Sequence, residues 1–125
     1  MKVKTKDLID EALDFAVAKC LNPDWDDEDL VAKVTSFDEF SGELWNFSTD
    51  WAQGGPIIEM TEITLDLTDV LFDHITDSAI LLKKPEWWAS KGNITGRGPT
   101  PLVAAMRCYV AYNFGNEIEI PEELK

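Results

Sequence analysis

The sequence predicts a single α+β domain, in which about three helices and a small, mostly antiparallel sheet form a layered sandwich. Three observations support this prediction. The chain has 125 residues, of which 45% are hydrophobic, and this suffices for one core. Apolar residues recur at helical spacing in some segments and at every second position in others. The expected strands follow one another with short turns between them, which favours antiparallel pairing.

A first helix is predicted from about Thr5 to Cys20, with Thr5 as its N-cap. Its apolar residues form one stripe at three-and-four spacing, which we expect to pack against the sheet: Leu8, Ile9, Ala12, Leu13, Ala16, Val17 and Cys20. Its outer face would carry Asp10, Glu11, Asp14 and Lys19.

Residues 22–46 form an acidic insertion. Eight acidic residues and one lysine stand between Asp24 and Glu43. An EF-hand loop counted from Asp24 would need glycine at its sixth position, where Asp29 stands, so no metal site is predicted and a solvated acidic surface is expected. Residues 31–37 fit either a strand or the continuation of a short helix that begins near Asp26, and both interpretations stay open.

Residues 47–60 contain a second possible helix. Ser48, Thr49 and Asp50 are three consecutive residues that can cap a helix. Pro56 follows two glycines, so the helix either begins after the glycines or runs from Asp50 through Pro56. The glycines either make a turn that lets Trp51 pack, or they let backbone amides point at a ligand.

Alternating residues predict a strand over residues 62–68, and short apolar runs predict further strands at 70–72, 79–82 and around Trp87. The one histidine, His74, lies between Asp73 and Asp77, and we expect it to be exposed in a loop. Residues 92–98 read as a flexible loop that matches no phosphate-binding motif. Residues 117–120 predict a short edge strand or a clamped tail.

A complete helix is predicted over residues 101–114, and we expect it at the centre of the fold. Thr100 is a good N-cap, Pro101 suits the first helical position and Gly115 suits the C-terminal end. Nearly every residue between them is apolar, and Arg107 is the one charge. A helix that is apolar on almost all sides is covered on almost all sides.

The composition excludes several classes of function. A net charge of −13 repels nucleic acid and anionic membranes and suits a basic partner. Neither a membrane-spanning run nor a signal peptide is recognised. The cysteines, Cys20 and Cys108, are expected as buried thiols in a cytoplasmic protein. With one histidine and no cysteine motif, neither zinc nor another cofactor is predicted.

Four strings carry a resemblance to a known family. They are STDWAQGGPIIE at residues 48–59, GPTPLVAAMRCYVA at 98–111, the opening MKVKTKDL, and EIPEEL at 119–124. Together they resemble the NinX-like family of small proteins from tailed phages and prophages of enteric bacteria. The resemblance implies a phage protein without an established activity, and it supplies no catalytic residues. A weaker similarity to phage α-β-α sandwich domains implies a layered fold.

The candidate site combines the two helix starts at residues 48–50 and 98–100. If the fold brings them together, their amides would bind an anion or a small polar molecule. Trp51 would supply a stacking face, Gln53 an amide and Arg97 a charge, while Arg107 would be buried and pair with Asp50. The candidate ligand-binding residues are Ser48, Thr49, Asp50, Trp51, Gln53, Gly54, Gly55, Arg97, Gly98, Thr100 and Arg107.

Three functions fit the sequence. The first is an accessory phage protein that binds a host protein or a small polar or anionic ligand through these segments. The second is an acidic mimic of nucleic acid that occupies a basic host protein. The third is a hydrolase that uses Asp50, His74 or Ser48, and it has the least support because no nucleophile–base pair is recognisable.

Overall fold

The computed structural model describes residues 1–37, 39, 42–68 and 86–124. Within these residues, four α-helices combine with antiparallel sheets of two and three strands, which confirms the α+β class. The strands predicted at 70–72 and 79–82, and His74 with its acidic neighbours, lie outside the described residues. Cys108 is a buried free cysteine, as expected, whereas Cys20 is free but only partly buried.

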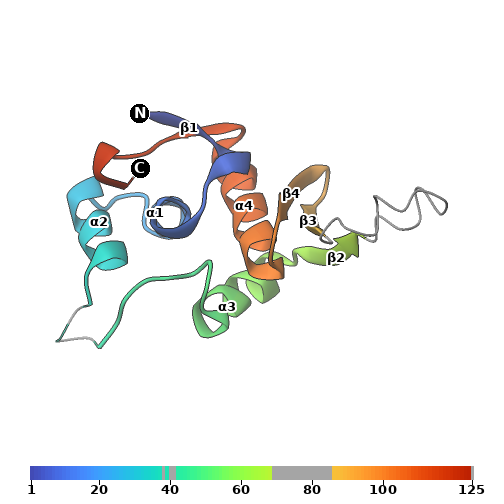
Figure 1. Cartoon of the computed structure of the whole chain (residues 1–125), viewed down its shortest axis with the longest axis horizontal. Helices are drawn as coiled ribbons and strands as arrows, with labels where there is room; N and C mark the ends of the chain where they lie inside the picture. The colour runs from blue at the N-terminus through green and yellow to red at the C-terminus, as the bar shows by residue number, and fades with distance from the viewer. Residues whose placement is uncertain (38, 40–41, 69–85, 125) are drawn as a thin grey trace, which may run out of the picture.

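Helix α4 (Pro101–Phe114) is the central element, as predicted. The Thr100 hydroxyl caps it by accepting from the amide of Val103 at 3.1 Å, and Gly115 ends it with a φ of +82°. Figure 1 shows α4 between α1 (Asp10–Leu21) and the three-stranded sheet. The helix contacts both, so its apolar surface is covered on opposite sides.

The three-stranded sheet consists of β2 (Thr64–Thr68), β3 (Glu86–Lys91) and β4 (Ile94–Gly98). The prediction of a flexible loop at residues 92–98 is therefore wrong, because residues 94–98 form β4 and only a tight turn precedes them. The glycines of this segment permit close packing instead of flexibility. A Cβ atom at Gly96 would lie 2.5 Å from the Cys108 nitrogen of α4.

The two ends of the chain pair with each other. Strand β1 (Lys2–Lys4) runs antiparallel to β5 (Glu117–Glu119), with Val3 opposite Ile118. The predicted short edge strand is thus confirmed, and its pairing with β1 holds the end of the chain in place. Just after β1, the Thr5 hydroxyl donates a hydrogen bond to the Gly115 carbonyl at 2.6 Å, which ties the start of the chain to the end of α4.

The first helix differs from its prediction in two ways. Thr5 belongs to a short 3-10 turn, η1 (Thr5–Asp7), and α1 begins only at Asp10. Thr5 does not cap α1 because its hydroxyl is bonded to Gly115. In addition, α1 packs on α2 (Asp27–Thr35) and α4, not on the sheet as predicted.

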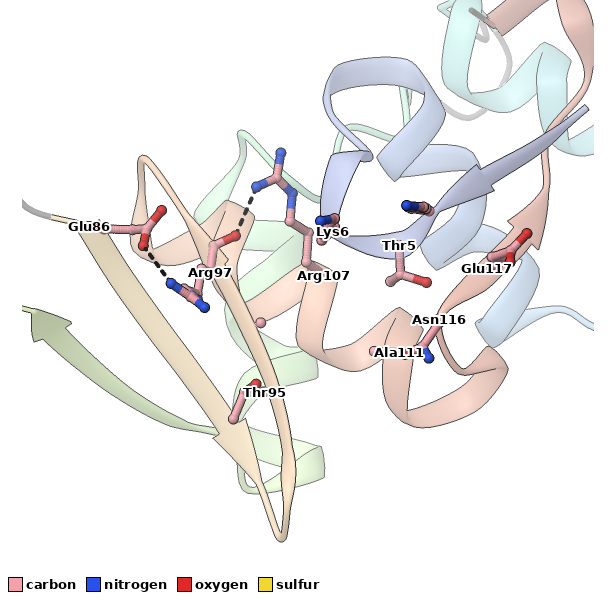
Figure 2. Close-up of a pocket in the computed structure, with 11 residues that line it drawn as sticks. Thr5, Lys6, Glu86, Thr95, Arg97, Arg107, Ala111, Asn116 and Glu117 are labelled. Atoms are coloured by element: carbon pink, nitrogen blue, oxygen red, sulfur yellow. Dashed lines mark hydrogen bonds and ion pairs between the residues drawn. The ribbon is translucent and has the colours of Figure 1, made fainter.

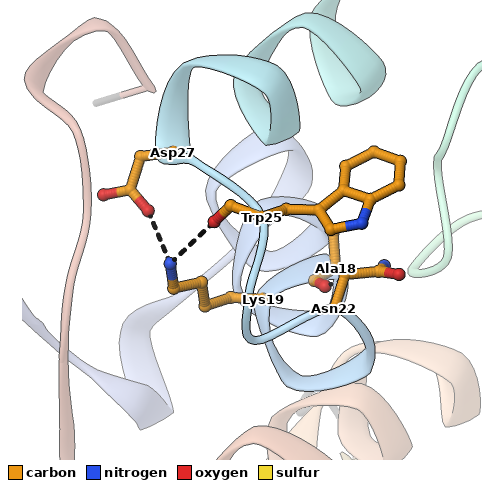
Figure 3. Close-up of polar contacts among 5 residues, drawn as sticks. All are labelled: Ala18, Lys19, Asn22, Trp25 and Asp27. Atoms are coloured by element: carbon orange, nitrogen blue, oxygen red, sulfur yellow. Dashed lines mark hydrogen bonds and ion pairs between the residues drawn. The ribbon is translucent and has the colours of Figure 1, made fainter.

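The acidic segment contributes α2, which ends at Thr35. Of the two interpretations of residues 31–37, the continuation of a short helix is therefore correct and the strand interpretation is wrong. Leu30 and Val34 bury the inner face of α2. The segment is joined to α1 by Lys19, whose ammonium donates to Asp27 at 2.9 Å and to the Trp25 carbonyl at 3.3 Å (Figure 3). One of the expected surface acids, Asp27, therefore remains exposed and forms an ion pair that joins α2 to α1.

Helix α3 (Trp51–Thr61) runs straight through the two glycines and Pro56. Its N-cap is Asp50, whose carboxylate accepts from the Ala52 amide at 2.9 Å. The interpretation with a helix that begins after the glycines is wrong. Pro56 lies on the exposed side of α3, where water can satisfy the carbonyl that loses its partner.

Candidate functional site

The structure brings the two predicted helix starts together. The residues before α3 and those before α4 line one pocket of about 340 Å³, which we call the junction pocket. Ile9 and Asp10, which lie where the chain passes from η1 into α1, form the third side of this pocket. Its lining residues are Ile9, Asp10, Ser48, Thr49, Trp51, Pro99, Thr100, Leu102 and Val103.

Gly54 makes this juxtaposition possible. A Cβ atom at Gly54 would lie 2.5 Å from both the Leu102 side chain of α4 and the Phe47 carbonyl oxygen. Gly54 is buried, so the first turn of α3 rests directly on the first turn of α4. Gly98 has a similar role, since a Cβ atom there would lie 2.8 Å from the Val103 side chain. Both glycines serve packing and do not line the pocket.

A buried hydrogen-bonded pair anchors the pocket to α1. Asp14 accepts from the Ser48 amide at 2.8 Å and from the Ser48 hydroxyl at 2.7 Å. Asp14 is only 4% exposed, so its predicted place on the outer face is wrong. Burial raises the pKa of the Asp14 carboxyl from 3.8 to about 6, although the bonds from Ser48 lower it.

Sequence reasoning missed this pair, although a signal was present. Asp14 precedes the apolar run Phe15–Ala18, and its position three and four residues before Val17 and Ala18 puts it on the buried side of α1. A carboxylate on that side needs a partner. Ser48 is that partner, and it is 2% exposed.

Gln53 is turned away from the junction pocket. Its side-chain amide donates to the Leu44 carbonyl at 2.8 Å and to the Asn46 side chain at 2.7 Å. Its carbonyl oxygen accepts from the Asn46 amide at 2.9 Å. These bonds fix the loop before α3. Gly55 lies on another side of the helix, where a Cβ atom would meet only the Trp51 ring, at 3.8 Å.

Arg107 does not pair with Asp50, so that prediction is wrong. Its guanidinium donates to the Leu8 carbonyl at 2.7 Å and to the Arg97 carbonyl at 2.8 Å. Arg107 lies about two helical turns beyond the start of α4, on the side that faces β4. It is half-buried, and burial lowers its pKa below the usual value.

Arg97 and Arg107 line a second and larger pocket of about 730 Å³ (Figure 2). We call it the basic pocket. Its charged residues come from both ends of the chain, from β3, from β4 and from α4: Lys4, Lys6, Glu86, Arg97, Arg107 and Glu117. Sequence reasoning missed Lys4 and Lys6, because nothing local to the opening segment indicates that it lines one pocket together with β4.

The described residues give the hydrolase interpretation no catalytic pair. Ser48 is bonded to Asp14 and not to a histidine, and His74 lies outside the described part. Within that part, no three potential ligands gather as a metal site would require. None of its helices has the length and apolar character needed to span a bilayer.

The described residues thus form a small, acidic α+β fold with two pockets flanking one buried helix. The family model described as Bacteriophage P22, NinX, matches residues 4–113. The chain therefore belongs to the NinX family of phage proteins. No curated protein matches the chain.

Proposed function

We propose that this phage protein is an accessory protein that binds a host protein through the junction pocket. The observation that carries the proposal is the apolar edge of the pocket. Trp51 is 52% exposed and Ile9 is 46% exposed, and both line it. Exposed aromatic side chains beside a small hollow are typical anchors of protein interfaces.

The size of the pocket supports a protein segment as the occupant. About 340 Å³ is at the lower end of the range for small-molecule sites, and it suits one or two inserted side chains. Leu102 and Val103 form an apolar floor, which favours an apolar side chain.

The charges around the pocket favour a basic segment over an anion. Asp10 lines the pocket and is exposed, and Asp50 lies at the adjoining end of α3. The first-turn amides of Ala52 and Val103 are already bonded to the two caps, so they are not available to an anion. A partner with an apolar side chain flanked by lysine or arginine fits both this rim and the net charge of −13.

The backbone at Asp10 agrees with this assignment. Asp10 has a φ of +53°, a conformation that costs free energy in a residue other than glycine. Such strain gathers at functional sites because the surrounding structure must maintain it.

A photocrosslinking experiment tests the proposal. A benzophenone amino acid is placed at Trp51 and, as the matched control, at Met60, which is 66% exposed near the other end of α3. In infected cells we expect one host protein to be crosslinked from position 51 and not from position 60. The same protein captured from both positions would contradict the proposal.

Titration of the purified partner completes the test. Trp51→Ala should weaken binding by about tenfold or more, as expected for an anchor, whereas Met60→Ala should leave it unchanged. Equal affinities of the two variants would refute the junction pocket as the binding site. If the partner binds nucleic acid and is displaced from it regardless of Trp51, the acidic-mimic alternative gains support.

A further inference from the structure

The basic pocket gathers positive charge in a strongly acidic chain. The sequence has 11 lysine and arginine residues against 24 acids. Four of those cations, Lys4, Lys6, Arg97 and Arg107, line this one pocket, together with only two acids, Glu86 and Glu117. Its local charge is therefore opposite in sign to that of the whole protein, and this requires an explanation beyond solubility.

Arg107 is held in place by two carbonyl groups and not by a salt bridge. Its two hydrogen bonds go to the carbonyls of Leu8 and Arg97, which fix the guanidinium. The carboxylates of Asp7 and Glu86 act on its charge without reaching ion-pair contact. Among the described residues, no carboxylate forms an ion pair with Arg107. A half-buried charge that no carboxylate contacts directly is unfavourable, and an anion that bound the guanidinium in the pocket would stabilise it further.

The other three cations of the pocket form few ion pairs among the residues that the structure describes. Arg97 makes one long ion pair with Glu86, at 3.6 Å, and stacks over the Trp88 ring at 4.2 Å, with 59% of its side chain exposed. Lys4 and Lys6 are exposed, and neither forms an ion pair with any carboxylate in the described part of the chain. Figure 2 shows the charged side chains that line the pocket.

We propose that the basic pocket binds a small phosphorylated anion. The planar guanidinium of Arg107, fixed by two carbonyls, presents its remaining N–H groups as a fork that matches phosphate oxygens. A volume of about 730 Å³ accommodates a metabolite-sized ligand.

The surroundings of the pocket select a small anion over a polymer. Glu86 and Glu117 line the pocket as well, so a nucleic acid or a long acidic peptide that extended through it would meet these carboxylates. The remaining surface, which gives the protein a net charge of −13, would repel such a polymer further. This inference is independent of the junction pocket and goes beyond the proposed host-protein function.

Isothermal titration calorimetry of the full chain tests it with three probes: inorganic pyrophosphate, adenosine 5′-monophosphate and adenosine. We expect saturable binding of the two phosphorylated probes at near-physiological salt, and no binding of adenosine. The affinity for pyrophosphate should fall as the salt concentration rises, because the contacts are ionic.

Variants identify the site. Arg107→Gln should weaken pyrophosphate binding by about tenfold or more, and Lys6→Gln by about threefold, because each removes a charge from the pocket. Lys2→Gln is the matched control: this lysine lies on β1, two residues from Lys4, and does not line the pocket. It should change the affinity less than about twofold.

Two results would overturn the proposal: absence of saturable pyrophosphate binding, or equal affinities of Lys6→Gln and the wild type. If Arg107→Gln fails to fold, the double variant Lys4→Gln/Lys6→Gln replaces it, because both lysines are exposed. A decamer of glutamate that binds more tightly than pyrophosphate would reassign the pocket to an acidic peptide and refute the small-anion assignment.

Discussion

Helix α4 has a pocket on each of two sides, and the two differ in chemistry. The junction pocket has an apolar floor and an acidic neighbour, and its buried carboxylate, Asp14, is bonded to Ser48 within the protein. The basic pocket has four cations and two acids, and Arg107 is bonded only to carbonyls. On the first side the buried carboxylate has its partner within the protein, whereas on the second side the lining residues carry more positive than negative charge.

The comparison shows that backbone contacts, not side-chain chemistry, are what the two sides share. On each side a glycine without space for a side chain brings another element against α4: Gly54 of α3 at the junction and Gly96 of β4 at the basic pocket. We therefore expect these two glycines to be needed for the frame of both pockets.

The largest effect is expected for Gly96→Ala. The added Cβ would lie 2.5 Å from the Cys108 nitrogen and 2.6 Å from the Ala104 oxygen, both backbone atoms of α4. Since backbone gives way less easily than a side chain, the free energy of unfolding should fall by about 3 kcal/mol. Urea unfolding followed by tryptophan fluorescence measures it.

The control is Thr95→Ala, because Thr95 is exposed, and it should cost less than about 0.5 kcal/mol. Equal unfolding midpoints of the two variants would mean that β4 does not lie this close to α4. The shared role of the two glycines would then not hold at the basic pocket.

Asp14→Asn tests the buried pair at the junction pocket through the pH dependence of stability. The Asp14 carboxyl has a pKa of about 6 in the folded protein against 3.8 ordinarily, so the folded state holds its proton more tightly. The contribution of this group to stability is therefore complete below pH 3.8 and is lost as the pH rises through about 6. An asparagine keeps an acceptor oxygen for Ser48 and has no proton to lose.

Relative to Asp14→Asn, the wild type should lose up to about 3 kcal/mol of unfolding free energy between pH 4 and pH 7. Unfolding midpoints measured across this range give the difference. The exposed Asp24→Asn should follow the wild-type profile. Parallel profiles of wild type and Asp14→Asn would show that Asp14 is not buried as described.

Gly54→Ala is expected to have a somewhat smaller effect than Gly96→Ala. Its Cβ would press on the Phe47 carbonyl and on the flexible end of Leu102, each at 2.5 Å, and the leucine can rotate away. We expect a loss of about 2 kcal/mol in the free energy of unfolding, measured by urea unfolding. A loss as large as that of Gly96→Ala would show that Leu102 cannot move.

Gly55→Ala should have the smallest effect and the opposite sign. A Cβ there would meet only Trp51 at 3.8 Å, which is an ordinary contact. Alanine is the better helix former, so stability should rise by about 0.5–1 kcal/mol in the same assay. Destabilisation would mean that α3 does not continue through the glycines.

The parts of the fold that the sequence predicts correctly are those with local signals. Thr100 and Pro101 mark the start of α4 and Gly115 marks its end, and alternation marks β2. The residues before α3 and those before α4 meet, as the candidate site requires.

The parts that it misses depend on distant contacts. Thr5 has the chemistry of a cap, but it is bonded to Gly115, more than a hundred residues further along the chain. The sequence suggests Asp50 as the partner of Arg107, but the guanidinium donates to the carbonyls of Leu8 and Arg97 instead. Spacing along a chain predicts which residues share a face, but it does not predict which other segment that face will meet.

The pairing of β1 with β5 has a consequence for dynamics. Each strand has only three residues, and short terminal strands open more readily than the core. Each opening would carry Lys4 and Glu117 away and dismantle one wall of the basic pocket. Amide hydrogen exchange at Val3 and Ile118 therefore reports how often that wall is absent, and any occupant of the pocket must slow this exchange in proportion to its occupancy.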